Sequence, residues 1–279
     1  MPADPLKSVL YSQDTFDVAN PNQQQIDTMV AAAQNINSSG FGTVILGQWH
    51  VHSNGGIYYN DSPLDSVIQA LKVIPTALKL GGSVKKVLLT FGPFGSDFEG
   101  IKNNISQFKK TMGGVQAETG IDGLDWDLEQ NYSEFSGLLV DLTKWANSLN
   151  MMVTAAPYQD PQFWIDVLKK TNTGGPAGFS WWNLQLYGGA DYAQWVKLLK
   201  GLVPDPEAFL VPGYSVSQGS TPSFVQGNLS QLQSSFPSLD GGFIWQYEEI
   251  AKKGFTVSQY AQAIAAGLGG AAAKGQRAG

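Results

Sequence analysis

Eight short runs rich in β-branched or aromatic residues recur along the chain, and their spacing limits its fold more than any other feature. They begin near Ser8, Gly42, Lys86, Gly123, Met151, Trp181, Phe209 and Gly242, at intervals of 28 to 44 residues. Segments with helical character lie between most of them, as in repeated strand–helix units that build a parallel sheet. Eight such units predict an α/β protein with a single (β/α)8 TIM barrel.

Capping residues and apolar periodicity place the helices of this barrel. We expect helices over 22–37, 63–80, 133–149, 161–170, 191–200, 223–236 and 257–268, with N-caps at Ser133, Asp191 and Ser223. Residues 1–268 should form one catalytic domain, and 269–279 a flexible tail rich in Gly and Ala. Residues 49–61 are expected to form a surface loop over a cleft. An open, doubly wound sheet is the main alternative, but no glycine-rich phosphate-binding motif follows the first run.

Composition excludes several classes of function. The chain is 43% hydrophobic and 14% charged with a net charge of −6, which is typical of a soluble globular protein. It contains no run of Lys and Arg, so we expect neither nucleic acid nor an anionic membrane as the main partner. The absence of cysteine excludes disulfides, thiolate metal sites and a cysteine nucleophile. We expect a secreted monomer, although no signal peptide is visible in the first residues.

The most informative segment covers residues 121–129, with the sequence I-D-G-L-D-W-D-L-E, at the fourth run. Period-two alternation puts Asp125, Asp127 and Glu129 on one face of a strand and apolar residues on the other. In a barrel these three side chains, which we call the acid row, point inward about 6–7 Å apart. Like charges so close cannot all ionise, so at least one carboxyl should keep its proton. A general acid needs such a proton near neutral pH, and Glu129, nearest the mouth, is the expected acid.

Two other interpretations of these residues are open. Three alternating acids also suit an exposed edge strand or a Ca²⁺ or Mg²⁺ site, but the Leu-Trp-Leu alternation disfavours an edge. Hard cations usually take six or more oxygen ligands, which one strand supplies poorly. His50 and His52 could ligate a metal, yet the chain has only two histidines, so we expect hydrogen bonds in a cleft loop or exposure to solvent. No metal and no cofactor are expected, and a serine hydrolase lacks its G-x-S-x-G signature.

The acid segment resembles glycoside hydrolase family 18, the chitinases and endo-β-N-acetylglucosaminidases, whose fourth strand carries D-x-x-D-x-D-x-E. The matching residues are Asp122, Asp125, Asp127 and Glu129. Residues 185–187 are similar to the family's Q-x-Y-N, residues 152–157 to its fifth strand, and residues 241–245 to its final strand, where a Trp lies beneath the sugar. The chain departs from the family where S-x-G-G is replaced by T-F-G-P at 90–93 and where Gly188 replaces Asn. These departures affect the expected substrate more than the expected chemistry.

The resemblance implies retaining hydrolysis of β-1,4 links between N-acetylglucosamine units, with the substrate's own 2-acetamido oxygen as nucleophile. Glu129 would be the general acid and then the base, Asp127 would orient the acetamido group, Asp125 would modulate Asp127, and Tyr187 would bind the acetamido oxygen. Chitin or chitooligosaccharides are the implied substrates. Cleavage of N-glycans, which contain the same link, stays open, as does a lectin that binds sugar without turnover.

The residues expected to contact this sugar lie near the predicted strand ends. In the sixth strand, Asn183, Gln185 and Tyr187 alternate as the carboxylates do, so all three can face the barrel interior. The full set of expected substrate-binding residues is Gln185, Trp245, Asp122, Asn183, Trp49, Tyr158 and Tyr214. Their expected partner is an oligosaccharide or polysaccharide that contains N-acetylglucosamine.

Overall fold

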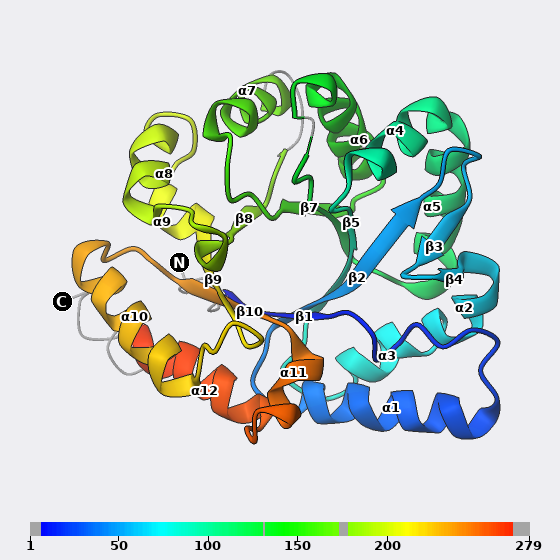
Figure 1. The fold of residues 1–279 in the computed structure, drawn as a ribbon, viewed down its shortest axis with the longest axis horizontal. Coiled ribbons are helices and arrows are strands. Elements are labelled where there is room, and N and C mark those ends of the chain that lie inside the picture. Colours follow the sequence, from blue (N-terminus) through cyan, green and yellow to red (C-terminus); the bar gives the residue numbers. More distant parts are fainter. Residues whose placement is uncertain (1–6, 131, 173–177, 270–279) are drawn as a thin grey trace.

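Eight parallel strands form a closed barrel in the computed structural model, which describes residues 7–130, 132–172 and 178–269 (Figure 1). They are β1 (Lys7–Ser12), β2 (Thr43–Val51), β5 (Lys86–Phe91), β6 (Gly123–Trp126), β7 (Met152–Ala155), β8 (Trp181–Leu184), β9 (Leu210–Ser215) and β10 (Gly241–Trp245). The barrel closes because β1 pairs with both β2 and β10. The predicted TIM barrel is therefore confirmed, and each strand begins within a residue of its expected start.

Helices surround the barrel (Figure 1). They are α1 (Gln23–Asn37), α2 (Leu64–Leu71), α3 (Ile74–Lys79), α4 (Gly95–Asn103), α5 (Ile105–Thr119), α6 (Ser136–Ser148), α7 (Pro161–Thr171), α8 (Tyr192–Leu199), α9 (Pro206–Phe209), α10 (Pro222–Ser235), α11 (Tyr247–Lys252) and α12 (Val257–Gly267). The described residues also form the 3-10 helices η1 (Tyr132–Glu134) and η2 (Leu186–Gly188). Among the described residues, no helix is long and apolar enough to cross a membrane.

Several predicted boundaries are wrong. The helix expected over 63–80 is divided into α2 and α3, with Pro75 in the first turn of α3, where its missing N–H is tolerated. Helices α4 and α5 were not predicted, because their segment contains many Gly and Asn residues, which are weak helix formers.

Of the three predicted N-caps, Asp191 is an N-cap as expected. The N-caps of α6 and α10 are Phe135 and Thr221, in place of the expected Ser133 and Ser223. The expected tail lies outside the described residues except for Gly269.

The segment 49–61 is a β-hairpin and not the expected loop. The end of β2 pairs antiparallel with β3 (Ile57–Tyr59), which pairs in turn with β4 (Ser62–Pro63). The rings of Trp49 and Tyr59 stack across this hairpin at 4.6 Å between centroids. Aromatic and β-branched residues at 57–59 favour a strand here.

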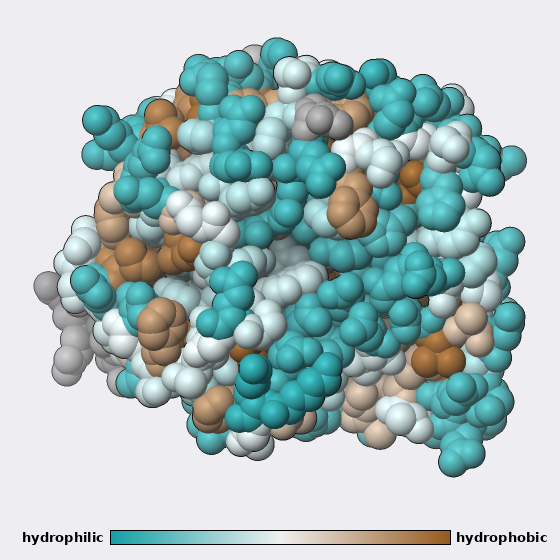
Figure 2. Space-filling model, viewed as in Figure 1, coloured by the Kyte–Doolittle hydropathy of each residue, from teal (hydrophilic) through white to brown (hydrophobic). Residues whose placement is uncertain are grey.

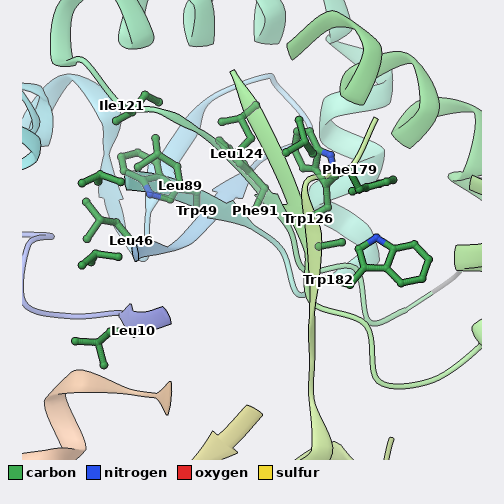
Figure 3. Close-up of a cluster of buried hydrophobic side chains, with 14 of the residues drawn as sticks. Leu10, Leu46, Trp49, Leu89, Phe91, Ile121, Leu124, Trp126, Phe179 and Trp182 are labelled. Atoms are coloured by element: carbon green, nitrogen blue, oxygen red, sulfur yellow. The ribbon is translucent and has the colours of Figure 1, made fainter. Parts of the chain in front are cut away.

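Two separate apolar clusters fill the molecule. The larger one lies between the strands and the helices and contains Leu10, Leu46, Leu89, Phe91, Trp126 and Trp182, as Figure 3 shows. The smaller one fills the barrel interior with Val9, Tyr11, Ile45, Leu88, Trp181, Val211 and Phe243. Neighbouring residues of one strand point to opposite faces, which is why Trp181 lies in the inner cluster and Trp182 in the outer.

Glu248 of α11 connects this helix to the turn after β1, at the carboxyl end of the barrel. Its Oε1 accepts hydrogen bonds from Ser12 Oγ at 2.6 Å, Thr15 Oγ1 at 2.8 Å and the backbone N–H groups of Asp14 and Thr15 at 3.1 Å. Its Oε2 accepts one from the N–H of Gln13 at 3.1 Å. One carboxylate therefore holds the turn after β1 against α11.

Candidate active site

The acid row extends beyond β6 because the chain continues alongside β5. The N–H of Asp127 donates to Phe91 O at 2.9 Å, and the N–H of Glu129 donates to Pro93 O at 3.2 Å. On the opposite face Trp126 is fully buried, and its indole Nε1 donates to Thr143 of α6 at 3.1 Å. The apolar residues thus pack beneath the helices, and the carboxylates face the barrel interior.

Asp125 is the deepest acid of the row and has no exposed surface. It accepts hydrogen bonds from the Tyr11 hydroxyl at 3.0 Å, the Asn183 amide at 3.3 Å and the Thr154 hydroxyl. Burial raises the pKa of the Asp125 carboxyl, and these hydrogen bonds oppose that rise. All three donors are neutral, so none of them supplies a positive charge.

Asp127 lies between the other two acids and is 5% exposed. Its Oδ2 accepts from Gln48 Nε2 at 3.1 Å and its Oδ1 from Gln185 Nε2 at 3.0 Å. Burial, followed by the charges of Glu129 and Asp125, raises the pKa of Asp127 well above its ordinary value. None of the ion pairs found among the described residues involves the acid row.

Glu129 is partly exposed at the mouth of the barrel. Its Oε1 accepts from Gln185 Nε2 at 2.9 Å, and the same nitrogen lies 2.8 Å from Ala156 O. Since one nitrogen reaches both Asp127 and Glu129, their oxygens are at most about 6 Å apart, a range in which like charges disfavour each other. Burial raises the pKa of Glu129, so this acid retains its proton to a higher pH than an exposed glutamate.

Three aromatic side chains lie at the same mouth. Tyr187, in η2, packs edge-on against Phe243, and burial followed by the charge of Asp127 raises the pKa of its hydroxyl well above the ordinary value. That hydroxyl is therefore a permanent hydrogen-bond donor at working pH. Tyr158 is partly exposed, and burial and then the charge of Glu129 raise its pKa. Trp245 ends β10, is partly exposed and lies edge-on to the Tyr11 ring at 5.5 Å.

The mouth itself is visible in Figure 2, which looks onto the carboxyl ends of the strands. The surface is hollowed near its centre, over the barrel, and is mostly hydrophilic around the hollow. These residues bring a proton donor, buried acids beside it, a tyrosine hydroxyl and flat rings together at the carboxyl end of the barrel, which suits acid–base catalysis on a polar ligand.

Trp49, Tyr214 and Asp122 are not at this mouth, so their expected contacts with sugar are wrong. Trp49 has no exposed surface and Tyr214 has 4%, and both belong to the outer core. Asp122 lies at the opposite end of the barrel, where it forms ion pairs with Lys79 at 3.0 Å and Lys86 at 3.4 Å.

Asn183 faces the interior as expected but does not reach the surface, so its predicted contact with sugar is also wrong. Its Nδ2 donates to the Tyr11 hydroxyl at 2.9 Å and to Asp125 at 3.3 Å, and its Oδ1 accepts from Trp181 Nε1 at 2.9 Å. Because all these partners are buried protein groups, Asn183 positions Asp125 and does not bind a ligand directly.

The sequence did not predict Tyr11, Gln48 and Thr154, whose side chains donate hydrogen bonds to the carboxyl groups of the acid row. Inward alternation with Val9 was a usable signal for Tyr11. Alternation along β2 could not predict the inward position of Gln48, because the pairing of β2 with β5 shifts register between Leu46 and Trp49. That irregularity reverses the alternation, so Gln48 faces inward and Trp49 outward.

The two histidines of the H-x-H segment do not converge on one point. His50 Nδ1 lies 3.2 Å from both carboxylate oxygens of Asp97, and His52 stacks on Tyr58 at 4.0 Å between centroids. Within the described part of the chain, no group of three or more His, Asp or Glu side chains is arranged to hold a metal ion.

Comparison with known proteins identifies the fold. No family model and no curated protein matches the chain. Among solved structures, the Group IV chitinase of Ostrinia furnacalis has 11% sequence identity and a TM-score of 0.66 over 95% of this chain and 100% of that chain. A family 18 chitinase from Chromobacterium violaceum has 16% identity and a TM-score of 0.60, over 94% of this chain and 83% of that one. A spore cortex-lytic enzyme of Bacillus megaterium has 10% identity and a TM-score of 0.58, over 94% and 74%. The chain therefore has a chitinase-like TIM barrel.

Proposed function

We propose that the protein is a retaining glycoside hydrolase of the family 18 type that cleaves β-1,4 links between N-acetylglucosamine units of chitin or chitooligosaccharides. One observation carries the proposal: Glu129 lies at the barrel mouth with a raised pKa, beside the buried Asp127 and Asp125. A carboxyl with a raised pKa keeps its proton to a higher pH, and it can deliver that proton to the leaving oxygen of a glycosidic bond.

The burial and hydrogen bonds of Asp127 favour the substrate's acetamido oxygen, and not this carboxyl, as the nucleophile. In a two-carboxylate mechanism Asp127 would have to attack the sugar as an exposed, ionised group. Instead both its oxygens accept hydrogen bonds, it is 5% exposed, and its pKa is raised well above the ordinary value. A buried, hydrogen-bonded carboxyl of this kind is poorly suited to attack C1, whereas one of its oxygens can accept a hydrogen bond from the acetamido N–H and so orient that group.

The reaction then proceeds in two steps. Glu129 donates its proton to the glycosidic oxygen, the bond from that oxygen to C1 breaks, and the acetamido oxygen bonds to C1 to give an oxazolinium ion. Glu129, now ionised, removes a proton from water, whose oxygen attacks C1 and reopens the ring with retention. Tyr187 holds the acetamido oxygen by donating its hydroxyl hydrogen, and Trp245 provides a flat surface beneath the sugar.

Mass spectrometry of reaction products tests this function. The wild type and Glu129→Gln are incubated with a panel of chitooligosaccharides and N-glycopeptides. Shortened chitooligosaccharides from the wild type alone are the expected result. Glycopeptides left with one N-acetylglucosamine would instead assign an endo-β-N-acetylglucosaminidase. Absence of any product, with retention on a chitin column, would assign a sugar-binding protein without turnover.

A thiazoline analogue of the oxazolinium ion tests the nucleophile separately. Transition-state and intermediate analogues bind far more tightly than substrates, so it should inhibit chitooligosaccharide cleavage. An aryl glycoside that lacks the 2-acetamido group should not be cleaved. No inhibition at millimolar concentration, or ready cleavage of that glycoside, would contradict substrate assistance.

A further inference from the structure

Gln48 of β2 contacts the acid row through a residue that is 6% exposed, and the proposed reaction assigns it no role. Its Nε2 donates to Asp127 Oδ2 at 3.1 Å. Its Oε1 is buried, and no donor in the described part of the chain reaches it. An unpaired buried carbonyl oxygen costs stability, so the amide is only half satisfied in this orientation.

Two hydrogen bonds to Asn60 hold the backbone of Gln48. The N–H of Gln48 donates to Asn60 Oδ1 at 3.2 Å, and Gln48 O accepts from the N–H of Asn60 at 2.7 Å. Asn60 Nδ2 donates in turn to Asp17 Oδ2 at 2.7 Å and to Gln13 O at 3.0 Å. These bonds brace β2 where its pairing shifts register, so the side-chain amide is the part of Gln48 that can turn.

Gln185, the other amide bound to Asp127, cannot turn in this way. Its Nε2 donates to Ala156 O at 2.8 Å, and a backbone carbonyl can only accept a hydrogen bond. The same nitrogen donates to Asp127 Oδ1 at 3.0 Å and to Glu129 Oε1 at 2.9 Å. A turned amide would place its carbonyl oxygen against Ala156 O, so Gln185 stays a donor. Because Asp127 Oδ1 faces this donor, a proton on Asp127 is placed on Oδ2, beside Gln48.

Titratable groups from several elements face Asp127. They are Asp125 and Glu129 of its own segment, Tyr11 of β1, Tyr132 of η1, Tyr158 after β7 and Tyr187 of η2. None of the ion pairs between described residues includes Asp127. Burial and the two neighbouring acids raise its pKa, so Asp127 stays protonated to a higher pH than an exposed aspartate and then needs an acceptor for its hydrogen.

We propose that Gln48 is a positioning residue whose amide turns with the proton of Asp127. Its Nε2 donates to Oδ2 when Asp127 is ionised, and its Oε1 accepts from Oδ2 when Asp127 is protonated. The two ends of an amide are similar in size, so the turn needs little space. The turn keeps the hydrogen on Oδ2 and leaves Oδ1 as an acceptor for the acetamido N–H. The inference rests on the proposed function, because it takes a 2-acetamido sugar to be the ligand of Oδ1.

Steady-state kinetics with chitooligosaccharides test the effect of Gln48 on turnover. Gln48→Met keeps the length of the side chain but removes both ends of the amide. We expect kcat to fall about tenfold and KM to stay within about twofold, because the acetamido group is misoriented while the sugar still binds. Gln162→Met is the matched control, because Gln162 also donates to an aspartate, Asp166, at 2.8 Å, but on the surface of α7. An unchanged kcat, or a rise in KM without a fall in kcat, would overturn the role of Gln48.

NMR of the side-chain amides of the ¹⁵N-labelled protein separates this inference from the proposed function, because it needs no turnover. The Gln48 signals are identified by their absence in Gln48→Met. An N–H that donates to an ionised carboxylate forms a strong hydrogen bond, so its proton signal should move upfield as the pH falls from 9 to 4 and Asp127 binds its proton. The movement should disappear in Asp127→Asn.

The outcomes of the two measurements are distinct. A Gln48 signal that follows Asp127, without turnover by the wild type, would overturn the proposed function and support the turning amide. Turnover by the wild type with a Gln48 signal that does not change with pH, or that still changes in Asp127→Asn, would overturn the inference alone. Absence of both turnover and a change in the signal would overturn both.

Discussion

The two ends of the barrel treat their carboxylates in opposite ways. At the amino ends of the strands, Asp122 pairs with Lys79 and Lys86, and Lys7 pairs with Asp240 at 2.9 Å. At the carboxyl ends, the side chains in the described part of the chain that donate to the acid row are neutral hydroxyls and amides. Neutral donors offset burial only in part, so the pKa of each acid in the row is raised. Asp122 and Asp240 therefore serve as ion-pair partners at the amino end, whereas the acids of the row keep their protons to a higher pH than exposed carboxyls do.

The largest effect expected from this difference follows the change Glu129→Gln. The amide keeps the shape of the side chain but has no acidic proton, so kcat should fall by about 10³-fold. Chitooligosaccharide hydrolysis rates and thermal unfolding measure the two consequences, and the unfolding temperature should stay close to that of the wild type. Activity comparable to the wild type would remove the distinction between the two ends.

Asp127→Asn should lower kcat by about 10²-fold while changing the pH dependence of stability. The folded pKa of Asp127 is raised, so the protein binds this proton more tightly when folded. The resulting stabilisation is fully present below about pH 4, the ordinary aspartate pKa, and is lost as pH rises through the raised value. Unfolding temperatures measured from pH 4 to pH 8 should therefore fall more for the wild type than for Asp127→Asn. Parallel curves would contradict the raised pKa.

Gln185→Met should move the alkaline limb of the activity profile. The Gln185 amide lowers the pKa values of both Asp127 and Glu129, opposing the larger effect of burial. Without that donor both pKa values should rise further, so kcat/KM, which requires protonated Glu129, should persist to higher pH although its maximum is lower. The pH profile of kcat/KM for chitooligosaccharide cleavage measures this shift. A limb that moves to lower pH would mean that another group limits activity.

The smallest effect on activity is expected for Asp122→Asn, the matched change at the opposite end of the barrel. It alters an acid of the same motif, yet kcat should stay within about twofold of the wild type. Its partly exposed ion pairs should contribute about 1 kcal/mol or less to the free energy of unfolding. Urea unfolding and hydrolysis rates check both expectations, and a loss of activity like that of Glu129→Gln would show that the two ends are not separate.

The fold could be predicted because its signals are local and repeat eight times. The acid row could be predicted equally well, since all its members alternate along one extended segment. The side chains that other strands contribute to the site were harder to predict, because whether they point inward depends on the register of each strand. A single irregularity in β2 exchanged the roles of Gln48 and Trp49, and no pattern in residues 43–51 marks it.

Two further errors came from treating nearness to a strand end as sufficient. Tyr214 is near the carboxyl end of β9 but has the parity of Leu210, which points outward, whereas Val211 points inward. Asp122 belongs to the motif but precedes the first residue of β6, so it lies at the amino end. Parity and strand direction, taken together, place both residues away from the mouth.

The hydrogen bonds of Glu248 couple the local opening of α11 to that of the turn after β1, although these segments are more than 200 residues apart in the chain. The N–H groups of Gln13, Asp14 and Thr15 have a side-chain carboxylate of α11 as their acceptor. They become free to exchange hydrogen with solvent only when that carboxylate moves away, and α11 then loses its anchor on the turn after β1. Amide exchange of residues 13–15 should therefore follow the opening of α11 and not that of the nearby α1.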